Sequence, residues 1–280
     1  MWKAFRLSTL LLCATLAACQ GQETDKKELK PMTADNIQQD LETLGNSRIY
    51  FGHMSVGANV IDGIKELQNR TGKAPVNIVE RGAMDNLPDN FLLHSPVGEN
   101  SKPLSKCIDF RSVIQTELKD KIDYALFKFC YIDFNENTDV EALFADYRKI
   151  MDELVVDYPD ITFIHVTTPL RSVDFGMGVW IREMLGRENR SKIKNIQRNR
   201  FNQLIRSTYG DQPILDLAAA ESTYPDGRRH TFKYQGDEVY YALIEEYTND
   251  GGHLNDTGKR KVAADFISSL AEIIRKSGKS

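Results

Sequence analysis

The chain has 280 residues and a formal net charge of −4, with 41% hydrophobic and 27% charged residues. This length suits one α/β domain with a substantial core and is too short for two large domains. The composition excludes a globally disordered chain, a collagen-like repeat and a polytopic membrane protein, and the near balance of charges argues against nucleic acid as a partner.

The first 19 residues have the pattern of an export signal. Lys3 and Arg6 form a basic start, and an apolar run leads to a Leu-Ala-Ala-Cys tetrapeptide that ends at Cys19. The run is shorter than the roughly 20 residues of a membrane-spanning helix. The tetrapeptide resembles a bacterial lipoprotein signal, which implies removal of residues 1–18 and a lipid anchor at Cys19 in the cell envelope. Gln20 after the cysteine favours the outer membrane, and an ordinary secretory signal cut elsewhere is the alternative.

Residues 19–32 are polar and charged and predict a tether, so the folded domain is expected to span 33–280. Apolar residues at helical spacing predict helices, and short apolar runs predict strands. In chain order the predicted elements are helix 35–45, strand 48–51, helix 56–68, strand 75–79, helix 110–118, strand 124–130, helix 140–156, strand 161–166, helix 189–208, strand 213–217 and helix 257–274. Residues 80–104 are predicted to be irregular, and 222–241 to be polar with room for a hairpin.

The alternation of strands and helices predicts a single three-layer α/β domain of the flavodoxin-like type. Its parallel sheet is expected to have about five strands, with helices on both faces. In such sheets the ligand crevice lies beyond the carboxyl ends of the strands. The residues that follow each predicted strand are therefore the candidates for a functional site.

The first candidate is Ser55, which follows Gly52-His53-Met54 between the first strand and the next helix. This placement directs its hydroxyl toward the crevice. The helix behind it offers backbone N–H groups and the positive end of its dipole. Because serine is also a favoured N-cap residue, a purely structural role is the alternative.

The second candidate is the pair Asp250 and His253, three residues apart on a loop that contains Gly251 and Gly252 and precedes the last helix. A serine hydroxyl is a weak nucleophile and needs a base. A histidine can supply that base, and a carboxylate can fix the imidazole tautomer and stabilise its charged form. The alternative is a turn in which aspartate and glycine serve only the backbone geometry.

A serine after the first strand and Asp-x-x-His before the last helix together resemble the SGNH/GDSL hydrolase superfamily, from Arg48 to about Ile274. The resemblance implies an SGNH-type fold and an exported serine esterase that needs no cofactor or metal. Ser55 would be the nucleophile, His253 the general base and Asp250 its orienting partner. The substrate would be an acylated small molecule or polysaccharide, with carbohydrate O-deacetylation as the expected reaction.

The resemblance also implies an oxyanion hole made by the Ser55 N–H, a glycine after the second strand and an asparagine after the third. Gly82 follows the second predicted strand. After the third, Ile132 stands where the asparagine is expected, so Asn135 is the nearest amide. Asp133 is a candidate for hydrogen bonding within the site.

Two further residues are candidates for lining the site. The usual Gly-Asp-Ser block here contains His53, which either contacts substrate or packs under the turn. Arg171 follows the fourth predicted strand and is a candidate for binding an anionic or polyhydroxyl substrate. The altered third block leaves open a non-catalytic glycan-binding or envelope lipoprotein on a degenerate SGNH fold, and an O-acyltransferase is a further alternative.

The residue types also allow a metal site and a disulfide. Asp250 and His253 with His53 offer metal ligands, but such a site leaves Ser55 without a role. Cys107 and Cys130 can pair in an oxidising compartment, with two free thiols as the alternative.

Overall fold

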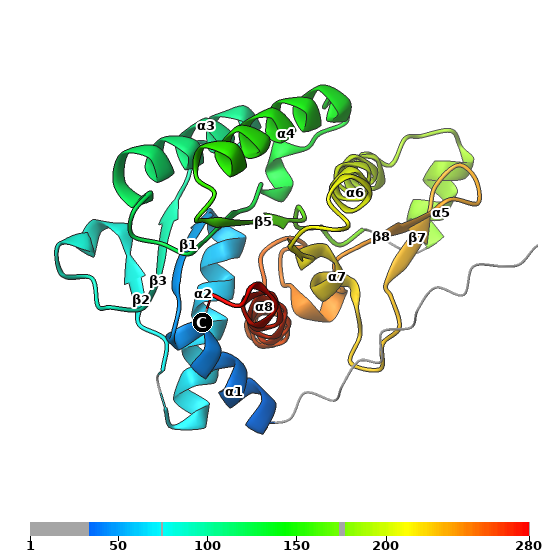
Figure 1. Ribbon diagram of the computed structural model, residues 1–280. Coiled ribbons are helices and arrows are strands. Elements are labelled where there is room, and N and C mark those ends of the chain that lie inside the picture. The colour runs from blue at the N-terminus through cyan, green and yellow to red at the C-terminus, as the bar shows by residue number, and fades with distance from the viewer. Residues whose placement is uncertain (1–33, 74, 174–176, 280) are drawn as a thin grey trace, which may run out of the picture. The chain divides into compact units, whose positions relative to one another are not determined.

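A parallel sheet of six strands forms the centre of the computed structural model, which describes residues 34–73, 75–173 and 177–279. The strand order is β2-β3-β1-β4-β5-β6 (Figure 1). The bounds are β1 Arg48–His53, β2 Ile78–Glu80, β3 Phe91–Pro96, β4 Tyr124–Phe127, β5 Thr162–Val166 and β6 Ile214–Leu215. The predicted α/β class with a parallel sheet is confirmed.

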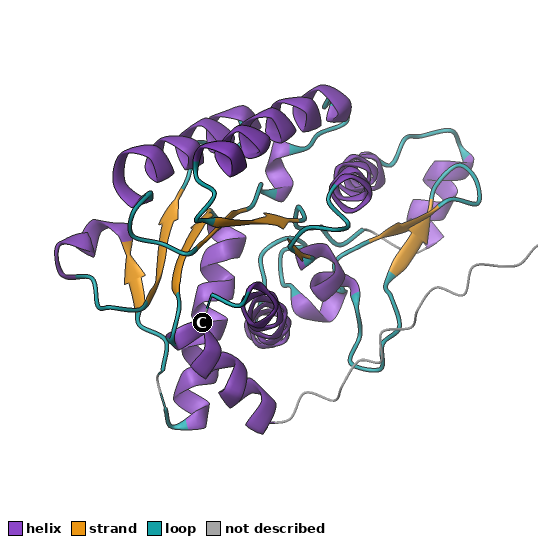
Figure 2. Ribbon diagram, viewed as in Figure 1, coloured by secondary structure: helices purple, strands orange, loops and turns teal. Residues whose placement is uncertain are grey.

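Helices cover both faces of this sheet (Figure 2). The elements on one face are α1 Ala34–Gly45, α2 Ser55–Thr71, α7 Leu217–Ser222 and α8 Asp256–Ser277. Those on the other face are α3 Pro103–Val113, α4 Val140–Asp157 and α6 Arg190–Thr208. The three predicted layers are therefore present.

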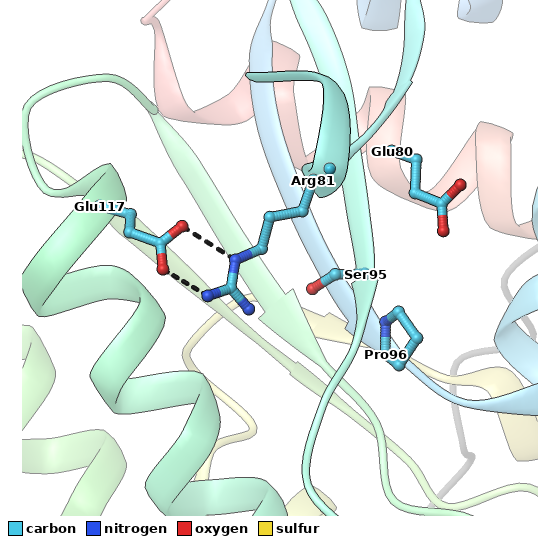
Figure 3. A pocket seen from close by; sticks show the side chains of 6 residues that line it. Glu80, Arg81, Ser95, Pro96 and Glu117 are labelled. Atoms are coloured by element: carbon cyan, nitrogen blue, oxygen red, sulfur yellow. Dashed lines mark hydrogen bonds and ion pairs between the residues drawn. The ribbon is translucent and has the colours of Figure 1, made fainter. Parts of the chain in front are cut away.

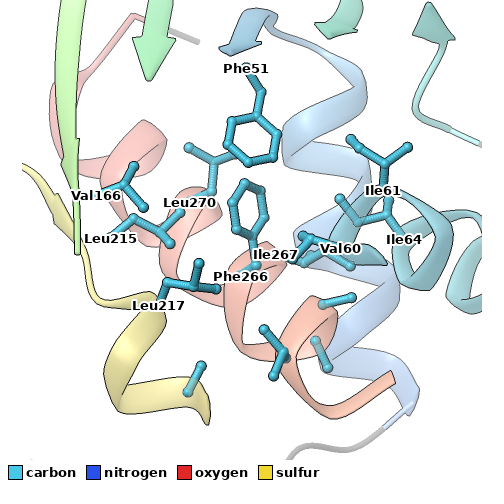
Figure 4. Close-up of a cluster of buried hydrophobic side chains, with 14 of the residues drawn as sticks. Phe51, Val60, Ile61, Ile64, Val166, Leu215, Leu217, Phe266, Ile267 and Leu270 are labelled. Carbon is cyan, nitrogen blue, oxygen red and sulfur yellow. The ribbon is translucent and has the colours of Figure 1, made fainter. Parts of the chain in front are cut away.

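Successive residues of a strand point to opposite faces of the sheet and pack into two separate cores, as expected for a sheet that is buried on both faces. Tyr50 packs with α3 and α4, while its neighbour Phe51 packs with α2 and α8, and both are fully buried. Figure 4 shows the core that contains Phe51, where the Phe266 ring from α8 packs against the Phe51 ring and Val60 from α2 belongs to the same cluster. The helical spacing of the apolar residues in α2 thus matches the face that it buries.

The sheet has six strands rather than about five, because β3 lies in the segment 80–104 that was predicted to be irregular. The apolar part of β3 is only three residues long, and Pro88 and Pro96 flank it, which is typical of a loop. The strand is nevertheless paired with β1 from Arg48 to His53 and with β2 on its other side. As a consequence, β3 separates β2 from β1.

Several smaller elements also differ from the prediction. Helix α3 begins at Pro103, since a proline costs no hydrogen bond in the first helical turn, and it continues into the π-helical turn η2 Ile114–Leu118. Helix α5 Met177–Met184 was not predicted. The hairpin for which the polar segment 222–241 has room is present, formed by β7 Thr231–Lys233 and β8 Val239–Tyr241.

Across the described residues, no helix is both long and apolar enough to cross a membrane. The predicted signal 1–18, the predicted lipid site Cys19 and the rest of the predicted tether 19–32 lie outside those residues.

The carboxyl ends of the central strands meet at one edge of the sheet. His53 at the end of β1 pairs with Pro96 of β3, and Gly52 pairs with Phe127 of β4. The segments that leave this edge next to one another are the start of α2 and the short turn η3 Tyr131–Asp133. This edge is where the site is built.

Candidate active site

Ser55 is the first residue of α2, two positions beyond the end of β1. Met54, with an extended backbone, precedes the helix, so Ser55 is not the N-cap residue and its side chain is exposed. The first helical hydrogen bond is donated by the Ala58 N–H to the Met54 carbonyl. The N–H groups of residues 55–57 therefore have no acceptor in their own helix and face the crevice side of the sheet.

His253 and Asp250 lie beside Ser55 although they are almost 200 residues away in sequence. The His253 Nε2 is 3.0 Å from the Ser55 Oγ, and its Nδ1 is 2.6 Å from the Asp250 Oδ2. Because Nδ1 faces a carboxylate, the neutral imidazole carries its proton there and presents the Nε2 lone pair to the serine. The three side chains form a continuous hydrogen-bonded line of hydroxyl, imidazole and carboxylate.

The Asp250 carboxylate is held by the backbone of its own loop. Its Oδ1 accepts hydrogen bonds from the N–H groups of Gly252, at 2.9 Å, and His253, at 2.8 Å. The pKa of Asp250 lies well below its usual range. The hydrogen bond from the His253 side chain lowers it most, and the two backbone N–H donors lower it further. The carboxylate is therefore ionised throughout the neutral pH range and is fixed toward the imidazole.

Arg171 holds the same loop from the outside. Its Nη2 donates to the Asp250 carbonyl at 2.8 Å and its Nε to the Gly251 carbonyl at 3.0 Å. Gly251 has a φ of 80° in the left-handed region, where a side chain would be strained, and an added Cβ would lie 2.8 Å from the Ser172 Oγ. Arg171 thus lies at the candidate site, where it contacts the loop that carries Asp250 and His253; its predicted contact with substrate stays a prediction.

Tyr131, in η3, completes the group of side chains around the imidazole. Its hydroxyl oxygen is 3.2 Å from the His253 Nε2 and 3.4 Å from the Nδ1. Its ring lies edge-on to the imidazole, with 5.6 Å between ring centroids, and the Arg171 guanidinium lies 5.1 Å from the tyrosine ring centroid. Sequence reasoning missed Tyr131, since no local pattern shows that this residue reaches the histidine.

Gly82 is separated from Ser55 by a strand, contrary to the predicted oxyanion-hole role. It follows β2, and β3 stands between β2 and β1. Gly82 instead lines an open pocket of about 360 Å³, shown in Figure 3, where Arg81 forms an ion pair with Glu117. The glycine that follows the strand next to β1 is Gly98, and its N–H already donates to the Asp109 carboxylate at 2.9 Å.

Asn135 is engaged in a local turn. Its backbone N–H donates to the Thr138 hydroxyl and its side-chain oxygen accepts from the Asn137 N–H, while the residue is exposed. Among the described residues, no hydrogen bond joins Asn135 to Ser55, Asp250 or His253. The predicted amide donor is therefore not brought to Ser55, because its own turn holds it elsewhere.

Asp133 is buried and stabilises the backbone around the site. Its carboxylate accepts from the Cys130 N–H at 2.6 Å and from the Ser101 N–H at 2.9 Å, and it forms a buried ion pair with Lys106. These contacts fix the turn that presents Tyr131. The predicted hydrogen-bonding role is present, but the partners of Asp133 are backbone and lysine rather than substrate.

His53 packs under the turn and does not line the site. Only 3% of its surface is exposed, and its Nε2 is 3.1 Å from the His94 Nδ1. Burial lowers the pKa of His53 to about 3, so the ring is neutral. Gly57 leaves the space for it, since a Cβ there would lie 2.3 Å from the His53 Cβ.

The remaining ligand-type residues form no metal site and no disulfide in the described part of the chain. No group of three or more His, Cys, Asp or Glu side chains has a geometry that could hold a metal ion there. Cys107 and Cys130 are both buried and free. Burial raises the pKa of the Cys107 thiol to about 12, which makes it an unreactive thiol.

No family model and no curated protein matches this sequence. Solved structures do resemble it. An acetyl xylan esterase, AlAXEase, is 17% identical over 80% of this chain and 99% of its own, with a TM-score of 0.45. A peptidoglycan O-acetylesterase is 12% identical over 87% and 96% of the two chains, with a TM-score of 0.46. A Desulfitobacterium hafniense protein described as lipolytic and of the G-D-S-L family is 10% identical over 80% and 99%, with a TM-score of 0.40.

Two of these three structures are thus described as esterases and the third as a lipolytic protein of the G-D-S-L family. At such identities the similarity describes the fold alone. What this chain does chemically has to be inferred from its own residues.

Proposed function

We propose that this protein is a serine esterase that works through a covalent acyl-enzyme. The supporting observation is the line of hydrogen bonds from the Ser55 Oγ to the His253 Nε2 and from the Nδ1 to the Asp250 Oδ2. Nucleophilic catalysis by a hydroxyl needs a base within hydrogen-bond reach and a third group that orients the base. Both requirements are met at an exposed point of the sheet edge.

The first half-reaction follows from these positions. As the Ser55 Oγ forms a bond to the ester carbonyl carbon, its proton passes to the His253 Nε2 and the carbonyl electron pair moves onto the oxygen. The ionised Asp250 stabilises the imidazolium, and the free N–H groups at the start of α2 can donate to the oxyanion. When the intermediate collapses, the bond to the leaving alcohol breaks and Nε2 returns the proton to it.

The second half-reaction uses the same groups. A water molecule attacks the acyl carbon, and its proton passes to the His253 Nε2. Collapse of this second intermediate breaks the bond to Ser55, and Nε2 returns the proton to the serine oxygen. The products are a carboxylic acid and the free enzyme, so no group in the site is consumed.

We infer that the substrate carries a small acyl group on a large polar molecule, with carbohydrate O-deacetylation as the proposed reaction. The side chains of His253 and Asp250 are 42% and 55% exposed, and Ser55 is exposed as well. A bulky leaving group can therefore approach the serine from solvent without entering a channel. A polysaccharide that bears acetyl esters has this shape and polarity.

The proposal is tested by hydrolysis of p-nitrophenyl acetate and by acetate release from a panel of O-acetylated polysaccharides. Ser55→Ala is expected to lose at least about 10⁴-fold in kcat, since the nucleophile is removed. Ser207→Ala, an exposed serine on α6, is the matched control and should retain full activity. Equal background hydrolysis by the native protein and Ser55→Ala would overturn the esterase assignment.

We also propose that the enzyme is exported and anchored by lipid at Cys19, on the strength of the sequence pattern of residues 1–19. Labelled palmitate fed to bacteria that express the full chain should enter the native protein. It should enter Cys13→Ser, which alters the predicted signal, but not Cys19→Ser. Incorporation into Cys19→Ser would contradict the anchor.

A further inference from the structure

We propose that the hydroxyl of Tyr131 donates a hydrogen bond to the oxyanion during the reaction and so takes the place of the missing asparagine amide. This inference rests on the esterase function proposed above. The expected amide position holds Ile132, whose side chain cannot donate a hydrogen bond, and neither Gly82 nor Asn135 is brought to Ser55. A hydrogen-bond donor to the oxyanion, in addition to the Ser55 N–H, therefore has to come from another residue beside the imidazole.

Tyr131 has the required position. Its hydroxyl oxygen and the Ser55 Oγ lie 3.2 Å and 3.0 Å from the same atom, the Nε2 of His253. The oxygen of an ester carbonyl whose carbon is bonded to the serine oxygen can lie between these two hydroxyls, within reach of the phenol. The phenol is a side-chain donor that contacts the imidazole at the nitrogen that faces Ser55.

The phenol is held rigidly in this position. The Tyr131 backbone carbonyl accepts from the buried Arg198 Nε at 2.9 Å, and the Arg171 guanidinium covers the ring. A Cβ at Gly252 would lie 2.8 Å from the Tyr131 Cζ and 3.1 Å from its hydroxyl oxygen. The glycine next to the catalytic histidine therefore leaves the space that the end of the tyrosine occupies.

The hydrogen bonds of the phenol change in step with the reaction. In the resting site Nε2 carries a lone pair and can accept from Tyr131 or from Ser55. Once Nε2 has taken the serine proton it is itself a donor, so the phenol O–H loses that acceptor and turns to the new negative charge on the substrate oxygen. When the intermediate collapses, Nε2 gives up its proton and accepts from Tyr131 again. The phenol keeps its proton throughout.

Burial raises the pKa of Tyr131 above its ordinary value, so the phenol remains a donor at neutral pH. Its neighbours are compatible with this role. Arg171 and Arg198 lie against the ring, and the Asp250 carboxylate is directed to the other imidazole nitrogen. The positive charges also favour an anion forming close to the phenol.

The test compares Tyr131→Phe with Tyr240→Phe, which removes a hydroxyl from the exposed hairpin. Loss of one oxyanion donor lowers kcat by about 10²- to 10³-fold. We expect that loss for Tyr131→Phe, with KM within about twofold, the acidic limb of the pH–rate profile unmoved, and an unchanged melting curve. Tyr240→Phe should match the native protein.

Three results are distinguishable. Full kcat in Tyr131→Phe, with Ser55→Ala inactive, overturns this inference and leaves the esterase function in place. In the second result, the acidic limb of the pH–rate profile of Tyr131→Phe shifts while the plateau rate stays unchanged. This would show that the phenol acts only through His253, and it would also overturn the inference. Equal background rates for the native protein and Ser55→Ala remove the esterase function and this inference with it.

Discussion

At the scale of single residues, Asp250 determines which nitrogen of His253 faces the serine. Its Oδ2 lies 2.6 Å from Nδ1, and its other oxygen is taken up by two backbone N–H groups. The low pKa of this carboxyl keeps it an acceptor across the neutral range. The proton of the neutral imidazole is thereby kept on Nδ1, and Nε2 is left free to act as a base.

Asp250→Asn tests this arrangement. The asparagine can still accept from the loop N–H groups, but its amide can donate to Nδ1 and so favour the tautomer with the proton on Nε2. We expect kcat for p-nitrophenyl acetate to fall by about 10⁴-fold while the melting temperature changes little. Asp226→Asn, an exposed aspartate away from the site, is the control. Near-native kcat in Asp250→Asn would show that the carboxylate does not orient the base.

At the scale of elements, the loop between η4 Glu245–Tyr247 and α8 has to be held in one conformation for the line of hydrogen bonds to form. Arg171 bridges two of its carbonyls, and the Leu254 N–H donates to the Asn59 side chain of α2 at 3.1 Å. The loop is thus fixed to both the segment after β5 and the helix that carries Ser55. Arg171 is in this sense a positioning residue.

Arg171→Ala is expected to lower kcat by about 10- to 100-fold, because the acid and base would leave their productive positions for part of the time. Arg171→Lys should recover only part of the loss, since an ammonium does not reproduce the planar fork that reaches two carbonyls. Arg187→Ala, an exposed arginine outside the site, is the control. Native kcat for Arg171→Ala in steady-state kinetics would show that Arg171 does not position the loop.

The elements also show where sequence reasoning stops. Five of the six strands were predicted, since each has a recognisable apolar run. The apolar run of β3 is only three residues long, and its place in the sheet comes from pairing along both of its edges. Missing β3 placed Gly82 beside Ser55, when it lies beyond an intervening strand. Strand order is a tertiary property, and a residue that only follows a strand cannot be assigned to a site without it.

The residues of the candidate site likewise fall into two groups, those that sequence motifs predict and those that they do not. Ser55, Asp250 and His253 occur in short motifs at fixed places relative to the first strand and last helix, so they were predicted from sequence. The contacts of Tyr131 and Arg171 with His253 and its loop join segments 122 and about 80 residues apart. No periodicity or motif encodes such contacts. These contacts can be predicted only once it is known which segments the folded sheet brings together at its carboxyl edge.

At the scale of the whole molecule, the ionisable side chains of Lys128 and Glu221 are fully buried. The Lys128 ammonium donates to the Phe129 carbonyl at 3.2 Å, and Glu221 of α7 accepts from the Leu170 N–H at 2.7 Å. The second Glu221 oxygen, Oε1, has no partner among the described residues. Burial raises the pKa of Glu221 to about 8, so the folded protein keeps this carboxyl protonated at neutral pH.

This proton makes the global stability depend on pH. An unfolded glutamate ionises near pH 4.5, so between about pH 4.5 and 8 the folded state binds a proton that the unfolded state lacks. The stabilisation is fully present below that range and is lost as the pH rises through it, by at most about 1.4 kcal/mol per pH unit.

Glu221→Gln removes the titrating group and keeps an acceptor for the Leu170 N–H. Urea unfolding at pH 5, 6, 7 and 8 should show the variant gaining stability relative to the native protein as the pH rises. Glu80→Gln, an exposed residue of β2, should follow the native curve. A constant difference between Glu221→Gln and native protein over this range would contradict the buried proton.

The central claim is that Ser55 is an activated nucleophile, and its most direct test is labelling with a fluorophosphonate followed by peptide mass mapping. This probe needs no knowledge of the acyl group or the alcohol. The account predicts one adduct per chain, on the peptide that contains Ser55, with much slower labelling of His253→Ala and none of Ser55→Ala. An unlabelled native protein, or an adduct on a different residue that persists in Ser55→Ala, would contradict it.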